Sequence, residues 1–132
     1  MDVETSPPGR SRHFSLRARL RSFSYAFAGI TYMLRTQHNA WIHVLATIVV
    51  VATAAALQIS LSDWRWIVLA IFLVWAAEAL NTAVEHVCDL VSPNYNIVVK
   101  RAKDVAAAAV LFSACSSVCI GALTFLPYLM RR

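Results

Sequence analysis

This sequence has few charged residues, few glycines and prolines, and no cysteine pair of the C-x-x-C type. Only 14% of its 132 residues are charged, whereas about a quarter are charged in an average soluble protein. Three glycines and four prolines exclude a collagen-like or low-complexity chain. A hydrophobic content of 59% excludes intrinsic disorder of the chain as a whole. The shortage of charge therefore indicates a lipid environment, and the length allows one domain.

The three cysteines, Cys88, Cys115 and Cys119, form an odd set. Neither a disulfide framework nor a thiolate zinc site is suggested by their spacing. Cys115 and Cys119 lie four residues apart in an apolar stretch, so they would share one face of a helix and act as small packing residues.

The charge balance is positive, with twelve Lys and Arg against seven Asp and Glu and a formal net charge of +5. Such a balance suits anionic lipid headgroups, anionic small molecules or nucleic acid. Composition alone does not choose among these partners.

Three stretches are long and apolar enough to cross a bilayer as helices, which takes about 20 residues. They are residues 41–59, 66–84 and 105–126. The short polar break at 60–63 predicts a tight hairpin between the first two spans. Pro93 and Asn94 should end the second span, and Pro127 should end the third.

Upstream of these spans, apolar residues recur at alternating steps of four and three, which is the period of an amphipathic helix. They are Leu16, Leu20, Phe23, Phe27, Ile30 and Leu34. We expect a helix over about 15–36 that lies in the membrane interface with its arginines toward anionic headgroups. A core helix of a small bundle is the alternative, and both can hold at once.

The fold class expected is therefore an all-α integral membrane protein with three transmembrane helices and an N-terminal amphipathic interfacial helix. Residues 1–14 are expected to be a disordered polar N-terminus, and residues 15–132 to form the membrane domain.

Orientation follows from the basic residues in the short segments that flank the spans. Six arginines precede the first span, three basic residues lie at 100–103, and the loop between the first two spans has only Arg65. We therefore expect a multi-pass protein whose N-terminus and second loop are cytoplasmic.

Two carboxylates, Glu78 and Glu85, lie in or at the end of an otherwise apolar span. A carboxylate at membrane depth costs several kcal/mol, so it usually marks function. With Asn81 they are spaced i, i+3 and i+7, which places all three on one helical stripe, and Thr82 joins that face.

Such a stripe is compatible with proton or cation conduction, with phosphoryl transfer, or with structural hydrogen bonds between helices. Phosphoryl transfer explains more residues, because the basic segment 100–104 at the same cytoplasmic level supplies positive charge for a polyphosphate. The sequence has no glycine-rich P-loop, so a nucleotide site would consist of side chains on helices.

The run Glu78-Ala79-Leu80-Asn81-Thr82-Ala83-Val84-Glu85 resembles a family signature, E-x-x-N-[ST]-A-[IV]-E. It is typical of the small prokaryotic integral-membrane diacylglycerol kinase and undecaprenol kinase family. Arg101-Ala102-Lys103-Asp104 resembles the R-A-K-D element before the last span of that family. Residues 25–30, 38–43 and 89–95 continue the resemblance, which covers roughly residues 20–128.

The resemblance implies an ATP-dependent and Mg²⁺-dependent lipid kinase of the bacterial cytoplasmic membrane. Its substrate would be a membrane lipid alcohol, with undecaprenol favoured and diacylglycerol next, because the 92–95 loop and the His-Asn-x-x-Ile-His stretch look more like the undecaprenol kinase branch. It also implies a homotrimer with active sites shared between neighbours, and no nucleic-acid partner. The alternative is a proton- or cation-conducting membrane oligomer, or a non-catalytic one that retains the kinase scaffold.

The resemblance also implies roles for individual residues. Glu78 matches the catalytic base, and Glu85 matches a carboxylate that binds Mg²⁺ on the nucleotide. The other residues that match ATP contacts are Tyr25, Asn81, Tyr95, Asn96, Lys103 and Asp104.

The sequence departs from the family pattern just before the first span. Where many members have a second metal-binding Glu, this sequence has Gln37, which offers one neutral carbonyl oxygen to metal and nucleotide. Trp41 also stands where relatives often carry Arg.

Other polar and aromatic residues are expected to have simpler roles. Interfacial or hydrogen-bonded roles are favoured over metal ligation for His38, His43 and His86. Trp64, Trp66 and Tyr128 are expected to be interfacial anchors.

Overall fold

The computed structural model describes residues 15–130, which form four α-helices. They are α1 (Leu16–Thr36), α2 (His38–Ala56), α3 (Leu61–Val91) and α4 (Ile97–Met130). This confirms the predicted all-helical class. The predicted disordered segment 1–14 and the terminal pair Arg131 and Arg132 lie outside the described residues.

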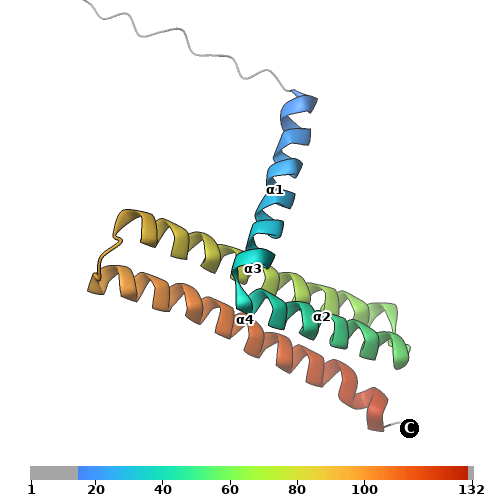
Figure 1. The fold of residues 1–132 in the computed structure, drawn as a ribbon. Helices are drawn as coiled ribbons and strands as arrows, with labels where there is room; N and C mark the ends of the chain where they lie inside the picture. The colour runs from blue at the N-terminus through green and yellow to red at the C-terminus, as the bar shows by residue number, and fades with distance from the viewer. Residues whose placement is uncertain (1–14, 131–132) are drawn as a thin grey trace, which may run out of the picture.

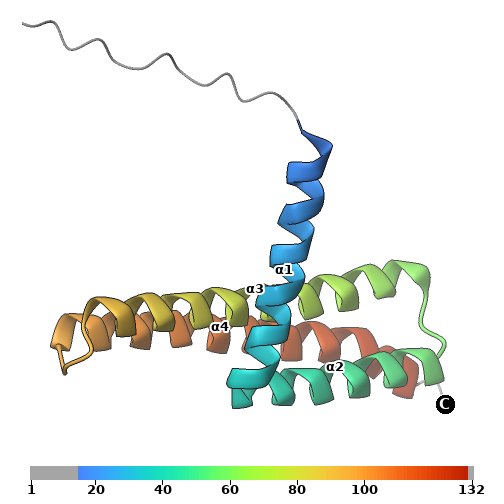
Figure 2. The same ribbon diagram turned by 45° about the horizontal axis from the view of Figure 1, so that its top comes forward.

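Helices α2, α3 and α4 run side by side in both views (Figures 1 and 2). All three are long and apolar enough to cross a membrane, which confirms the predicted number of spans. At about 1.5 Å per residue, α3 and α4 exceed the ~30 Å hydrocarbon core, so their ends reach beyond it. Many large apolar side chains on these helices are exposed, as lipid-facing side chains would be.

Helix α1 crosses the other three steeply, and its C-terminal part lies beside the middle of α3 (Figures 1 and 2). Its packing against α3 includes the rings of Tyr32 and His86, which meet edge to face with centroids 5.2 Å apart. Leu16, Leu20 and Phe23 remain exposed along the rest of the helix. A helix that lies in the membrane plane while the others cross the bilayer would have this direction.

The turn between α2 and α3 differs from the predicted break at 60–63. Helix α2 ends at Ala56, Gln58 adopts a left-handed conformation with φ of 50°, and α3 begins at Leu61. Ser60 caps α3, because its side-chain oxygen accepts a hydrogen bond from the Asp63 amide. Three of the four polar-break positions therefore belong to the first turn of α3, since a capped N-terminus tolerates polar residues.

The sequence predicted that the third span would end at Pro127. Helix α4 instead continues through Pro127 to Met130. A proline removes the hydrogen bond that its own nitrogen would donate, and its ring crowds the carbonyl four residues earlier, but membrane helices tolerate both effects. The extra turn brings Tyr128 to the start of α3. Its hydroxyl donates to Asp63 Oδ2 at 2.6 Å and accepts from the Ser60 amide at 2.8 Å. We call Ser60, Asp63 and Tyr128 the Tyr128 cluster.

Helices α3 and α4 pack along most of their length, and small polar groups tie them together. Ser117 Oγ on α4 donates to the Ala70 carbonyl on α3 at 3.1 Å. A small apolar core of Ala54, Ile59 and Ile67 joins α2 to this pair. The framework therefore holds the face of α3 that carries Glu78 at a fixed position between α1, α2 and α4.

Candidate active site

The predicted stripe on α3 is buried in the structure. Only 1% of Glu78 and 6% of Asn81 and Thr82 is exposed, while Glu85 is half-buried. Asn81 Nδ2 donates to Glu85 Oε1 at 3.0 Å, so these two members of the stripe are in direct contact. We call Glu78, Asn81, Thr82 and Glu85 the Glu78 stripe.

Three buried atoms of the Glu78 stripe have no hydrogen-bond partner within the described residues. They are Glu78 Oε2, Asn81 Oδ1 and Thr82 Oγ1. Leaving a buried polar group without a partner costs about 1–3 kcal/mol, and more when the group is charged. Such atoms are rare in native proteins, and a catalytic role or a bound ion or water is a common reason for them.

One ionisable side chain of α2 approaches this stripe. His43 Nε2 lies 3.7 Å from Glu78 Oε2, and His43 is half-buried. The imidazole also lies edge to face with Trp75, whose indole N–H donates to Thr47 Oγ1 at 3.1 Å. Glu78 thus faces a histidine that is itself held by neighbouring side chains.

Two ion pairs lie where α3 ends and α4 begins. Lys103 Nζ on α4 pairs with Asp89 Oδ1 on α3 at 2.5 Å, and Lys100 pairs with Asp104 at 2.6 Å within α4. These groups are largely exposed, so their contribution to stability is small. Their position provides ammonium groups near the Glu85 end of the stripe.

The remaining predicted nucleotide contacts are separate from the stripe in this single chain. Tyr25 and Tyr95 are 69% and 82% exposed, and Gln37 is half-buried at the junction of α1 and α2. Within residues 15–130, no hydrogen bond or ion pair joins any of these three to Glu78 or Glu85.

Asn96 has a local structural role in addition to its predicted one. Its Oδ1 accepts from the amides of Val98 and Val99, at 2.8 and 3.4 Å, and so caps the start of α4. Capping fixes the direction in which Tyr95 and the basic first turns of α4 leave the loop.

The donor set suits a metal that arrives on a nucleotide better than a metal held by protein alone. Among the described residues, no group of three His, Cys, Asp or Glu side chains is close enough to hold an ion. Mg²⁺ in phosphoryl-transfer sites typically takes one or two carboxylates together with the substrate phosphates. Glu85 has the carboxylate chemistry that such a site requires, and its Oε1 accepts a hydrogen bond from Asn81.

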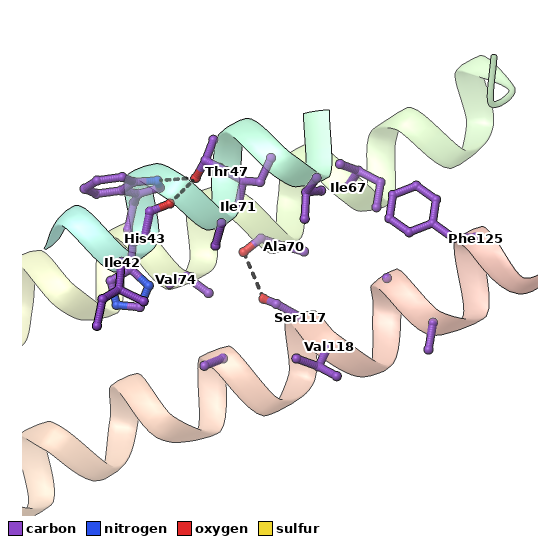
Figure 3. Close-up of a pocket in the computed structure, with 16 residues that line it drawn as sticks. Ile42, His43, Thr47, Ile67, Ala70, Ile71, Val74, Ser117, Val118 and Phe125 are labelled. Atoms are coloured by element: carbon purple, nitrogen blue, oxygen red, sulfur yellow. Dashed lines mark hydrogen bonds between the residues drawn. The ribbon is translucent and has the colours of Figure 1, made fainter. Parts of the chain in front are cut away.

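An apolar cavity of about 550 Å³ lies between α2, α3 and α4, and His43 is one of the residues that line it (Figure 3). Its walls include Val50, Ile67, Ile71 and Phe125. The cavity connects the middle of the spans with the histidine that faces Glu78, so an apolar chain could approach the stripe from within the bilayer.

Comparison with known proteins identifies the family. Residues 24–125 match the family described as prokaryotic diacylglycerol kinase. The chain belongs to this family.

Two curated relatives extend the comparison. The diacylglycerol kinase of a Synechocystis species is 40% identical over 135 residues, which cover 97% of this chain and 77% of the relative. The undecaprenol kinase of Bacillus subtilis is 38% identical over 109 residues, which cover 83% of this chain and 89% of the relative. The chain is therefore a lipid kinase and a multi-pass membrane protein, and its family implies ATP and a lipid as substrates.

The structure places two further residues, Asp89 and His43, near the Glu78 stripe. The sequence did not assign either residue to the site. Asp89 lies four residues after Glu85, so helical spacing alone extends the stripe to it. His43 lies 15 residues before Gln58 and Glu78 lies 20 residues after it, so their proximity depends on the offset between α2 and α3 that the structure shows and not on equal spacing about the turn.

Proposed function

We propose that this kinase transfers the γ-phosphoryl group of ATP to the hydroxyl of a membrane lipid alcohol at the cytoplasmic surface. Undecaprenol is the favoured acceptor and diacylglycerol is next. The observation that carries the proposal is the buried Glu78 carboxylate in an apolar span, with an unpartnered oxygen, on the same stripe as the bonded pair Asn81 and Glu85.

Glu78 is proposed to be the catalytic base. Its Oε2 takes the hydroxyl proton while the alcohol oxygen forms a bond to the γ-phosphorus and the bond from that phosphorus to the bridging oxygen breaks, which releases ADP. An unpartnered carboxylate oxygen supports this role, because it has room to accept a hydrogen bond from a substrate hydroxyl.

Glu85 is proposed to hold Mg²⁺ that is bound to the nucleotide, and Gln37 is proposed as the second, neutral contact. When bound, the metal would neutralise part of the phosphate charge. Asn81 supports this function from within the chain, since its amide donates to Glu85 Oε1 and leaves Oε2 available.

Lys103 and Asp104 are proposed to contact ATP from the start of α4. Lys103 is held by Asp89, and the ammonium group is partly exposed, so it can approach a polyphosphate. Tyr25, Tyr95 and Asn96 are proposed to lie near the base and sugar of the nucleotide. With the second loop and the N-terminus cytoplasmic, all of these groups would face the compartment that contains ATP.

A homotrimer with shared sites is proposed as the assembly. Tyr25, Gln37 and Tyr95 are not bonded to the stripe of their own chain, and the stripe itself has three unpartnered buried atoms. Both features support a site completed by a neighbouring copy. Cross-linking of the purified kinase in a bilayer mimetic should yield a ladder that ends at the trimer.

The preference for undecaprenol is proposed from the 92–95 loop and the stretch that contains His38 and His43. The apolar cavity beside His43 supports a substrate with a long apolar chain but suits more than one lipid. Relatives with either name match this chain at similar identity.

The test is transfer of radiolabelled phosphate from ATP by purified protein in mixed micelles, with undecaprenol and diacylglycerol offered in turn. We expect transfer to both lipids, a higher kcat/KM for undecaprenol, and no transfer after chelation of Mg²⁺. Higher kcat/KM for diacylglycerol would reverse the substrate preference, and no transfer to either lipid would contradict the proposed reaction. If liposomes containing the protein conduct ions without ATP, the conducting alternative holds instead.

A further inference from the structure

The buried carboxylate of Glu78 has one ion-pair contact among the described residues, and that contact is with His43. The two atoms, His43 Nε2 and Glu78 Oε2, are 3.7 Å apart. This separation is slightly longer than a hydrogen bond. Hydrogen bonds of catalytic groups are often long without substrate and shorten in the complex.

His43 has neighbours on two helices: Thr47 on α2 bonds to its backbone, and Trp75 on α3 meets its ring. Thr47 Oγ1 donates to the backbone carbonyl of His43 at 2.7 Å and accepts from the indole N–H of Trp75. The rings of Trp75 and His43 meet edge to face with centroids 6.2 Å apart. Trp75 is also one turn before Glu78 on α3, so the same segment positions both partners. Figure 3 shows His43 and Thr47 on the same helix at one end of the cavity.

We propose that His43 is a positioning residue for phosphoryl transfer: its Nε2 faces one lone pair of Glu78 Oε2 and so holds the carboxylate with the other lone pair toward the lipid hydroxyl. The inference rests on the proposed role of Glu78 as the base. A glutamate side chain has three rotatable bonds, and within the described residues the one ion-pair contact of the Glu78 carboxylate is with His43. A base that is misplaced by about 1 Å loses about 10²-fold in rate.

A purely structural role for His43 predicts different results. As a wall residue of the cavity, His43 would affect packing, and its loss would lower thermal stability without a selective effect on kcat. As a positioning residue, it affects kcat, leaves the KM for ATP unchanged, and is replaceable by another side chain with a donor at the same place.

The kinetic test compares His43→Leu with His43→Gln in the full-length kinase. Glutamine carries an N–H donor at a reach similar to that of imidazole Nε2. We expect His43→Leu to lower kcat by at least about ten-fold, with the KM for ATP within two-fold of the parent and an unchanged helical circular dichroism spectrum. His43→Gln should restore most of kcat.

The matched control is His86→Leu, the same substitution on an exposed residue of α3 whose ring meets that of Tyr32. It should leave kcat within two-fold of the parent. The inference is overturned if His43→Leu also stays within two-fold, or if His43→Gln is as slow as His43→Leu.

A second measurement does not depend on turnover or on the folding of the leucine variant. Nitrogen NMR of the kinase labelled on histidine should show one imidazole signal that disappears in His43→Gln. We expect this signal to move in Glu78→Gln and to stay in place in Glu85→Gln. The inference is overturned if the chemical shift of the His43 signal is unchanged in Glu78→Gln.

The two measurements also separate this inference from the proposed function. If the parent phosphorylates lipid and Glu78→Gln does not, normal kinetics of His43→Leu overturn only the role of His43. If Glu78→Gln keeps its activity, the base assignment fails and the positioning role fails with it.

Discussion

Two polar clusters lie on the same apolar helix, α3, and they differ in how completely their groups are paired. In the Tyr128 cluster, the Ser60 amide donates to the Tyr128 hydroxyl, and the hydroxyls of Tyr128 and Ser60 both donate to Asp63 Oδ2. In the Glu78 stripe, three buried atoms have no partner within the described residues.

The comparison shows that polarity within a membrane helix does not by itself mark a catalytic site. A polar cluster whose bonds are satisfied internally stabilises the fold, whereas one that is buried and left incomplete is a better candidate for function. Substitutions in or near the Glu78 stripe should therefore change activity, and substitutions in the Tyr128 cluster should change stability.

The largest effect is expected from Glu78→Gln. The amide has nearly the shape of the carboxylate but does not accept the hydroxyl proton, so kcat should fall by about 10²- to 10⁴-fold. Helical content and ATP binding should be largely retained. The measurement is radiolabelled transfer to lipid, with circular dichroism and nucleotide binding on the same preparation.

The outcome of Glu78→Gln also tests the meaning of an incomplete cluster. Because a buried carboxylate oxygen without a hydrogen bond is costly, and Glu78 Oε2 has none within the described residues, the neutral variant should unfold at the parent temperature or higher. Activity within a few-fold of the parent would show that Glu78 is not the catalytic base. A marked fall in thermal stability would show that the Glu78 stripe stabilises the fold, as the Tyr128 cluster does.

The next largest effect is expected from Lys103→Ala, which should raise the apparent KM for ATP by about ten-fold. The ammonium offsets phosphate charge near a site from which bulk water is partly excluded. Lys103→Arg keeps the charge and should stay within about three-fold of the parent. Normal ATP kinetics in both variants would show that Lys103 serves only topology and its pair with Asp89.

A smaller effect is expected from Gln37→Glu. With a neutral amide at residue 37, Mg²⁺ should be held mainly by Glu85 and the nucleotide, so the parent should be active but should need a high concentration of free Mg²⁺. The added carboxylate should lower that concentration several-fold, as measured by titrating Mg²⁺ at fixed Mg-ATP. An inactive parent that only the glutamate rescues would contradict this view, and an unchanged dependence would place residue 37 away from the metal.

The sequence was sufficient to predict the four helices and the buried stripe, because both follow from local spacing. Apolar length set the three spans, and the i, i+3, i+7 pattern placed Glu78, Asn81 and Glu85 on one face. Their roles, together with those of the other proposed ATP contacts, remain predictions.

The features that the sequence did not predict depend on contacts between helices. Pro127 predicted a helix end by its local chemistry, but the bond from Tyr128 to Asp63 favours one further turn. Tyr128 was expected to anchor the protein at the interface, and the structure shows that its hydroxyl also joins two spans. The proximity of His43 to Glu78 required the register of the hairpin, which no local pattern encodes.

The smallest effect on activity is expected from Tyr128→Phe, which breaks the satisfied cluster and leaves the stripe intact. The variant keeps the ring but removes the hydroxyl, so the Ser60 amide and Asp63 each lose one hydrogen bond. Because these groups are partly accessible to water, we expect the unfolding midpoint to fall by only a few degrees and kcat to stay within about two-fold of the parent. Thermal unfolding in micelles checks the midpoint, and lipid phosphorylation by the same preparation checks kcat.

The matched control is Tyr95→Phe in the exposed second loop, which should leave the midpoint unchanged, since no hydrogen bond of its hydroxyl is present within the described residues. If Tyr128→Phe lowered kcat as strongly as Glu78→Gln, the two ends of α3 would be coupled, and completeness of hydrogen bonding would no longer distinguish the structural cluster from the catalytic one.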